Sequence, residues 1–159
     1  MTYAHYIAGD WVTDDAVSIN INPSNTDDIV GEFSRGNAAR VDKAVAAANA
    51  AQPDWSTASP QLRHDVLEKA SNLITSRKDD LGRLLSREEG KTLAEGIGET
   101  MRAAQVFKFF AGEAIRNVGD AVASIRPGID VTVEREAVGT IGLITPWNFP
   151  IAIPAWKLA

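Results

Sequence analysis

Apolar and polar residues follow different patterns in three zones of the chain. In the first zone, residues 3–33, short apolar stretches are separated by turn signals, and the stretch 6–12 carries apolar residues on both sides of Gly9-Asp10. Two short apolar runs around a glycine-containing turn predict a β-hairpin. Isoleucines that alternate with asparagines over 19–22, and an apolar run over 29–33, predict two further short strands.

Apolar residues recur at helical spacing over 37–117, where we expect four helices. The first ends at Pro53, because proline lacks the N–H that a helix interior requires. The dipeptide Ser59-Pro60 is typical of a helix start, and Thr92 with Glu95 forms a capping box. The expected ranges are 41–52, 60–74, 80–87 with an end at Gly90, and 92 to about 119. The second helix carries one apolar face, made of Leu62, Val66, Leu67, Ala70, Leu73 and Ile74.

The third zone begins with a pattern typical of a β-hairpin. Strands over 122–126 and 129–136 flank Pro127-Gly128, a dipeptide that suits a type II turn because glycine tolerates positive φ. Valines alternate with polar residues along the second strand, so one face is polar. A two-stranded ribbon is only marginally stable alone. We therefore expect it to pack on a part of the protein outside this chain, or on another subunit.

Residues 139–145 show a nearly unbroken apolar run, with Ile141, Leu143 and Ile144 close together. Such a run predicts a strand buried on both faces, as in a parallel sheet covered by helices. A loop over 146–150 follows, and then an apolar stretch from Ile151 that can open a helix. Strand, loop and helix form the first half of a βαβ unit, so we expect an α/β fold that is incomplete as given.

Composition and charge limit the classes of function. The 159 residues are 45% hydrophobic with a net charge of −5, which predicts about one globular domain with a sizeable core. The acidic balance argues against a nucleic-acid surface and against electrostatic binding to an anionic membrane. We find no secretory signal pattern, and no uncharged apolar run reaches the roughly 18 residues that span a bilayer. A soluble, cytoplasmic protein is expected.

The residue types available for metal or thiol chemistry are few. The absence of cysteine excludes disulfides, thiolate metal sites and a cysteine nucleophile within this chain. His5 and His64 have no further ligand at metal-binding spacing, so we expect no metal site. Gly96-Ile97-Gly98 lies inside a helical pattern rather than after a strand, which argues against a dinucleotide-binding loop. Glu88 and Glu89 are neighbours on a helix, point apart and are expected on a solvated face.

The loop 146–150 is the strongest candidate for function, because loops after parallel strands form the sites of α/β sheets. Two prolines restrict it and can hold the Asn148 side chain in one direction. An amide NH₂ aimed into a cleft can stabilise charge that develops on a carbonyl oxygen. In the alternative interpretation, Asn148 caps the following helix while Trp147 and Phe149 fill the core. The residues alone favour this alternative.

A resemblance to a known family favours the interpretation of Asn148 as an oxyanion donor over that of a helix cap. The run GLITPWNFP over 142–150, followed by Ala155-Trp156-Lys157, closely resembles the aldehyde dehydrogenase superfamily. Weaker landmarks occur in the family's order, at Tyr6 to Trp11, Asn22-Pro23, Trp55 and Glu89-Gly90-Lys91. The segment 151–157 is similar to the branch that oxidises α-ketoglutaric semialdehyde, and succinic semialdehyde dehydrogenases are close relatives. One departure is Ala137, where the family commonly has proline.

The resemblance implies a division of the chain. Residues 1–120 would be N-terminal strands and helices of the cofactor-binding domain, and residues 121–137 the β-hairpin of an oligomerisation element. Residues 138–159 would be the first, truncated βα unit of a Rossmann-like cofactor-binding sheet. The expected fold class is therefore α/β, the N-terminal part of the aldehyde dehydrogenase fold.

The resemblance also implies roles for particular residues. Asn148 matches the oxyanion-hole asparagine, which binds the thiohemiacetal and thioester oxygen. Ile144, Thr145, Pro146 and Trp147 match the wall of a cleft for NAD or NADP, on its nicotinamide-ribose side. Lys157 matches a lysine behind the active site, near the water and proton path. The other interpretation of Lys157, a solvated lysine on a helix, stays equally open.

For a full-length protein the implied activity is NAD(P)-dependent oxidation of an aldehyde, such as a semialdehyde, to its carboxylic acid through a thioester. The partners would be a small-molecule aldehyde and further copies of the chain in a dimer or tetramer. The nucleophilic cysteine and general-base glutamate lie beyond Ala159 in the family, so the isolated chain is expected to be inactive. The alternative is a non-catalytic relative that acts as an interaction or structural protein. A stand-alone nucleotide-binding module is disfavoured because no glycine-rich phosphate loop is present.

Overall fold

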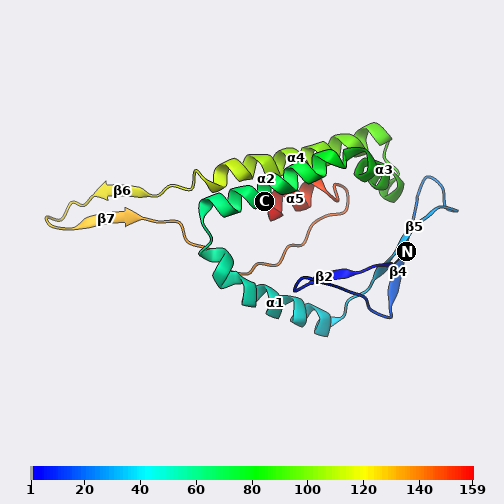
Figure 1. Cartoon of the computed structure of the whole chain (residues 1–159), viewed down its shortest axis with the longest axis horizontal. Helices are drawn as coiled ribbons and strands as arrows, with labels where there is room; N and C mark the ends of the chain where they lie inside the picture. Colours follow the sequence, from blue (N-terminus) through cyan, green and yellow to red (C-terminus); the bar gives the residue numbers. More distant parts are fainter. Residues whose placement is uncertain (1) are drawn as a thin grey trace.

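The computed structural model describes residues 2–159 and has an elongated shape. Helices form one layer, a β-hairpin extends from one end of it, and the first helix lies with the N-terminal strands below (Figure 1). The strands are β1 (Thr2–Tyr3), β2 (His5–Ile7), β3 (Asp10–Val12), β4 (Val17–Ile21), β5 (Ile29–Ser34), β6 (Asp120–Ala123) and β7 (Asp130–Val133). The helices are α1 (Ala38–Ser56), α2 (Pro60–Ser76), α3 (Lys78–Glu89), α4 (Leu93–Ala114) and α5 (Ala152–Leu158).

The N-terminal strands form two small sheets, as the alternating pattern predicts. β2 and β3 make an antiparallel hairpin whose turn places Ala8 and Gly9 at φ 56° and 90°. Two successive residues of positive φ are typical of the tight hairpin turns whose twist matches that of the strands. The second sheet has the order β1-β5-β4, with β1 parallel and β4 antiparallel to β5.

The predicted helix caps are confirmed. Ser59 accepts a hydrogen bond from the Leu62 N–H at the start of α2, and Thr92 and Glu95 form both bonds of the capping box. Gly90 ends α3 in the left-handed conformation at φ 77°, which glycine adopts without steric cost. α4 ends at Ala114 rather than near 119, and the residues that follow, Asn117 to Gly119, are poor helix formers.

The prediction that Pro53 ends the first helix is wrong, because α1 continues to Ser56. Proline leaves one carbonyl, that of Asn49, without its helical partner. Asn49 is exposed, so water can replace the missing N–H. The helix ends where the hydroxyls of Ser56 and Thr57 donate to the Pro53 carbonyl at 2.9 and 3.0 Å.

The core lies between α2, α4 and α5 and consists mostly of small residues. Ala103, Val106 and Ala155 form its centre. The hydroxyl of buried Ser71 donates to the Ala104 carbonyl at 2.8 Å, which satisfies the only polar group of α2 that is fully inside. Of the predicted apolar face of α2, the members Leu62, Val66 and Leu73 are exposed. The face that meets α4 instead includes His64, whose ring nitrogen lies 2.9 Å from the Ala111 carbonyl.

Glycines set the close approach of α3 and α4. A Cβ atom on Gly96 would lie 2.5 Å from the Gly82 carbonyl oxygen, and one on Gly82 would lie 2.5 Å from the Ile97 side chain. Gly96 is therefore a packing residue, which explains the Gly96-Ile97-Gly98 motif without a nucleotide.

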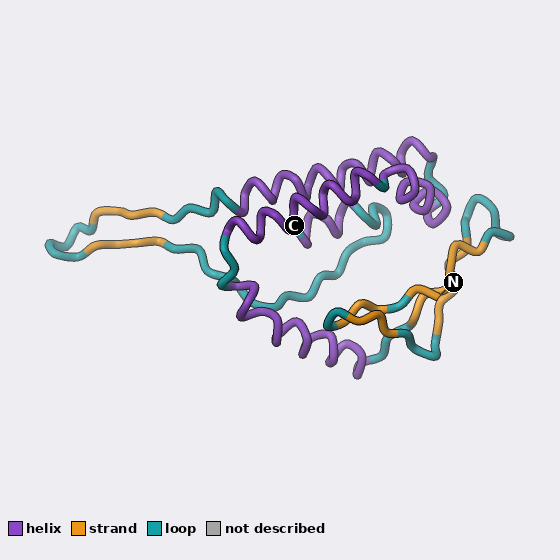
Figure 2. Tube along the Cα trace, viewed as in Figure 1, coloured by secondary structure: helices purple, strands orange, loops and turns teal. Residues whose placement is uncertain are grey.

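The hairpin of β6 and β7 forms around the predicted Pro127-Gly128 turn, although its strands are shorter than expected. Ala121 faces Thr132, and Gly128 has φ 75°. Every residue of both strands is exposed, so neither face is covered. In Figure 2 the ribbon stands clear of the helices.

The strand expected over 139–145 is not formed in this structure. The segment runs back from the hairpin beneath the helical layer to α5 as a loop (Figures 1 and 2). Its apolar side chains are exposed, with Val138 at 94% and Ile144 at 95%. A parallel strand needs neighbours to pair its N–H and C=O groups, and no strand in residues 2–159 lies beside this segment. The expected burial on both faces is therefore wrong for this chain.

Two further properties concern the described residues alone. None of the helices within 2–159 combines the length and the apolar character that crossing a bilayer requires. In the same residues, His, Asp and Glu side chains form no group of three that could hold a metal ion.

Candidate active site

The loop 146–150 borders a cleft built from three separate parts of the chain. Trp147, Asn148 and Pro150 form one wall, the end of α3 through Lys91 forms another, and Asn20 of β4 closes it. The cleft has a volume of about 690 Å³. It brings the predicted oxyanion residue together with the Glu89-Gly90-Lys91 motif, which lies 57 to 59 positions earlier in the sequence.

The Asn148 side chain does not cap the helix that follows. α5 has Ile151 at its N-cap position and no side-chain cap bond from its own segment. Asn148 is exposed toward the cleft, and Trp147 is 85% exposed rather than part of the core. The alternative interpretation, in which Asn148 caps the helix while Trp147 and Phe149 fill the core, is therefore wrong. An amide NH₂ in such a position is free to donate to a ligand oxygen.

The cap of α5 comes instead from Glu99, which reaches across from α4. Its Oε1 accepts from the N–H groups of Ile151 at 3.1 Å and Ala152 at 3.2 Å. The Glu99 side chain is only 4% exposed. A buried carboxylate is costly unless donors surround it, and the orphan N–H groups of a helix N-terminus are suitable donors.

Lys91 completes this arrangement by linking α3, α4 and the loop. Its Nζ donates to Glu99 Oε2 at 2.5 Å, forms an ion pair with Glu89 and lies 5.1 Å from the centre of the Phe149 ring. Burial acts to lower the pKa of Lys91, but its hydrogen bonds to Glu89 and Glu99 act to raise it, and the net shift is upward. Lys91 is therefore charged at neutral pH, as the two carboxylates require.

Glu99 is the residue that sequence reasoning missed. It lies on the α4 face that also carries the buried Gly96, Thr100 and Ala103. A carboxylate at a buried helical position is rare unless it is paired. The buried helical position of Glu99 is therefore the signal in the sequence that could have found it. The partners of Glu99 lie 8 and about 52 residues away, so no local motif contains them.

The expectation that Glu88 and Glu89 form a solvated face is wrong. Both are partly buried, because α3 packs on β4 and β5. Glu88 Oε1 accepts from the Asn20 side chain at 2.8 Å. Burial raises the pKa of Glu88 above its usual value, and the charge of Glu89 raises it further, against the opposing effect of the Asn20 hydrogen bond.

The other predicted site residues lie along the approach to the cleft or away from it. Ile144 is almost fully exposed, Thr145 is half-buried and Pro146 is exposed. Within residues 2–159, the backbone of 144–147 makes no hydrogen bond to another backbone group, so this stretch can offer backbone groups and the Trp147 face to a flat ligand. It fits one wall of a nicotinamide site, but nothing in it would hold the phosphates. Lys157 is exposed in the last turn of α5 and does not line the cleft.

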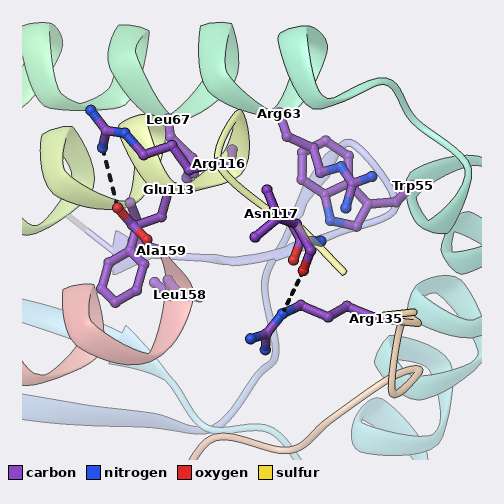
Figure 3. A pocket seen from close by; sticks show the side chains of 12 residues that line it. Trp55, Arg63, Leu67, Glu113, Arg116, Asn117, Arg135, Leu158 and Ala159 are labelled. Carbon is purple, nitrogen blue, oxygen red and sulfur yellow. Dashed lines mark hydrogen bonds and ion pairs between the residues drawn. The ribbon is translucent and has the colours of Figure 1, made fainter. Parts of the chain in front are cut away.

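A second cavity lies at the opposite end of the helical layer (Figure 3). Arg63, Arg116 and Arg135 surround it with Trp55, and Glu113 pairs with Arg116 at 3.2 Å. The Arg135 Nε donates to the Val118 carbonyl at 3.2 Å. None of the predicted site residues lines this cavity, so the cleft at Asn148 is the better candidate for chemistry.

Known proteins resemble this chain in sequence and fold. Residues 11–159 match the aldehyde dehydrogenase family. The chain is 37% identical to the α-ketoglutaric semialdehyde dehydrogenase of Bacillus subtilis, over 99% of this chain and 33% of that protein. The chain thus spans about a third of the length of the curated relatives it matches.

Solved structures give the same result. An NADP-dependent enzyme from E. coli superposes with a TM-score of 0.93 at 33% identity, over 97% of this chain and 32% of that one. A double mutant of Staphylococcus aureus betaine aldehyde dehydrogenase in complex with NAD+ superposes with a TM-score of 0.93 at 29% identity, over 98% and 32%. The predicted fold class is confirmed. With the family match over almost its whole length, the chain belongs to the aldehyde dehydrogenase family.

Proposed function

We propose that this chain supplies the oxyanion side and part of the cofactor wall of an NAD(P)-dependent aldehyde dehydrogenase. In a protein of the relatives' length, the substrate would be a semialdehyde such as α-ketoglutaric semialdehyde, oxidised to its carboxylic acid. The observation that carries the proposal is the Asn148 amide, uncommitted to any cap and exposed at a cleft beside a buried ion-pair network.

The chemistry assigns a limited role to this chain. A thiolate attacks the aldehyde carbon, and the carbonyl oxygen becomes an oxyanion that the Asn148 NH₂ would stabilise. A bound nicotinamide serves as the hydride acceptor. The resulting thioester is hydrolysed by water with the help of a base, which releases the acid and regenerates the thiolate. Neither the thiolate nor a cysteine that could form it is present in these 159 residues.

The proposed substrate and cofactor are inferred from the relatives of this chain. The Bacillus subtilis relative is an α-ketoglutaric semialdehyde dehydrogenase, while the solved neighbours include an NADP-dependent enzyme and a complex with NAD+. We propose that Ile144 to Trp147 contact the nicotinamide side of either cofactor. Lys157 would act behind the active site, on the path of water and protons.

The test is a kinetic comparison in the full-length enzyme with α-ketoglutaric semialdehyde and with NAD or NADP. We expect Asn148→Ala to lower kcat by roughly 10²- to 10³-fold, because it removes one oxyanion donor. Asn72→Ala removes an exposed amide from α2 and serves as the matched control. An Asn148→Ala enzyme with the wild-type kcat would rule out the proposed role.

A second candidate function follows from the fully exposed hairpin of β6 and β7. We propose that it joins copies of the chain in a dimer or tetramer, either within the enzyme or as the main role of a non-catalytic relative. Ile125 at its tip is 100% exposed, and an apolar ribbon of this kind gains stability by pairing. Sedimentation of an Ile125→Glu, Val131→Glu variant measures whether the dimer or tetramer is lost, and the aldehyde assay measures whether the protein oxidises aldehyde. Together the two measurements distinguish assembly within an enzyme from assembly as the main role of a non-catalytic relative.

A further inference from the structure

We infer that Glu99 is a positioning residue, which with Lys91 holds the loop of Asn148 in the orientation that an oxyanion donor requires. This inference rests on the proposed function, because it gives the Glu99–Lys91 pair a role in the same site. It concerns residues of α4 and of the Glu89-Gly90-Lys91 motif that lie outside the predicted set of site residues.

Donors surround both oxygens of the Glu99 carboxylate. Oε1 accepts two backbone N–H groups, from Ile151 and Ala152, and Oε2 accepts the Lys91 ammonium at 2.5 Å. Both oxygens are therefore occupied in a side chain that is 4% exposed. Hydrogen bonds to a charged acceptor are among the strongest in proteins, and they are stronger still where water is excluded.

The stretch of chain between these bonds and Asn148 is short. Ile151 follows Asn148 by three residues, and one of the two between them is Pro150, whose ring fixes its φ. Phe149 directly follows Asn148, and the centre of its ring lies 5.1 Å from the Lys91 Nζ. The residues that follow Asn148 are thus fixed by one ion pair, whereas Trp147 before it is free in solvent.

The helix α5 does not by itself hold the loop in place. α5 is a helix of seven residues with no side-chain cap of its own. Short helices are marginal without tertiary contacts. Without Glu99, the first N–H groups of α5 would be unpaired in a partly buried place, and the start of the helix would shift or fray. Asn148 would then occupy several orientations, and a displacement of about 1 Å at a catalytic group can cost a hundredfold in rate.

The experiment compares Glu99→Gln with Glu113→Gln in the full-length enzyme. Glu113 lies on the same helix, but its pair with Arg116 is exposed, so Glu113→Gln controls for the loss of one carboxylate. Glu99→Gln keeps the shape of the side chain and loses the charge that Lys91 requires. We expect its kcat to fall roughly 10- to 100-fold with the KM for the cofactor nearly unchanged. Lys91→Met should give a similar loss, and the double variant should lose less than the product of the two.

A purely structural role for Glu99 predicts a different result. It would lower the free energy of unfolding while each folded molecule kept the wild-type kcat, and that outcome would overturn the inference. Lys91→Met keeps the question decidable if the Glu99→Gln protein does not fold.

Hydrogen exchange gives a readout that does not depend on aldehyde chemistry. We expect the amides of Ile151 and Ala152 to exchange at least several times faster in Glu99→Gln than in wild type or Glu113→Gln, since they lose a charged acceptor. Unchanged exchange at these two amides would refute the positioning role even if catalysis were lost. If the wild-type enzyme oxidises no aldehyde, the proposed function fails, and exchange alone then decides whether Glu99 holds the loop.

Discussion

At the scale of single residues, charged side chains of opposite sign lie close together at the cleft. Lys91 lies between Glu89 and Glu99 and is balanced by them. Glu88 has only the Asn20 amide as a partner, and its neighbour Glu89 carries a like charge. The pKa of Glu88 is raised, so the ionisation of Glu88 works against the folded state.

The sign of this effect gives a pH-dependent prediction for Glu88→Gln. A folded-state pKa above the usual 4.5 means that the folded protein binds this proton more tightly than the unfolded chain does. Stability is therefore lost as pH rises from about 4.5 through the folded pKa. The substituted amide stays neutral and can still accept from Asn20, so the variant should gain stability relative to wild type between pH 4 and pH 7. Urea unfolding at both values measures this, and an equal difference at both would contradict it.

How far single residues can be predicted from the sequence depends on where their partners lie. Trp147, Asn148 and Lys157 could be proposed as site residues from the sequence because the family's motif is contiguous or nearly so. Glu99 was not, because its bonds join residues 91, 99 and 151 in space alone. The same reason explains the error on Glu88 and Glu89, whose helical spacing says nothing about the strands β4 and β5 that pack on α3.

At the scale of elements, helix caps and hairpins were predicted well, whereas the strand that needs a distant partner was not. The caps at Ser59, Thr92 and Gly90 form between residues that are close in the sequence. A short stretch of sequence is therefore enough to predict them. The apolar run over 139–145 is a strand only if a neighbouring strand satisfies its backbone, and residues 2–159 offer none. Pro53 did not end α1, which continues for one further turn and leaves the carbonyl of exposed Asn49 to water.

The contact of α3 with α4 gives a prediction at this scale. Gly96→Ala places a methyl group 2.5 Å from the Gly82 carbonyl oxygen and 2.7 Å from the Ser86 hydroxyl, so the helices must separate. We expect a loss of about 1–3 kcal/mol in the free energy of unfolding. Gly98→Ala is the matched control on the same helix, since no atom lies within 4 Å of its added Cβ. That variant should gain roughly 0.5–1 kcal/mol. Denaturant titration of both variants measures these changes in the free energy of unfolding. A Gly96→Ala protein as stable as wild type would show that α3 and α4 are not closely packed where they cross.

At the scale of the whole molecule, the exposed surface is large for the length of the chain. It amounts to 11319 Å², whereas a compact monomer of this mass would expose about 7,700 Å² by the usual scaling. Much of the excess is apolar, along the hairpin, the segment 138–144 and the outer side of α2. Surfaces of this kind are normally covered by other parts of a protein or by another subunit.

This surface and the lack of cysteine together predict how the 159-residue chain behaves when it is produced alone. Its small core should give broad, weakly cooperative thermal unfolding, and its uncovered apolar face should bind the dye ANS in buffer without denaturant. It should not reduce NAD or NADP in the presence of aldehyde, because an oxyanion donor without a nucleophile leaves the thioester route closed. Calorimetry, dye fluorescence and absorbance at the nicotinamide band test the three statements separately. A sharp transition without dye binding would mean that the helical layer is sufficient for a stable fold, and cofactor reduction at an enzymatic rate would mean that the chain performs the oxidation without a thiolate.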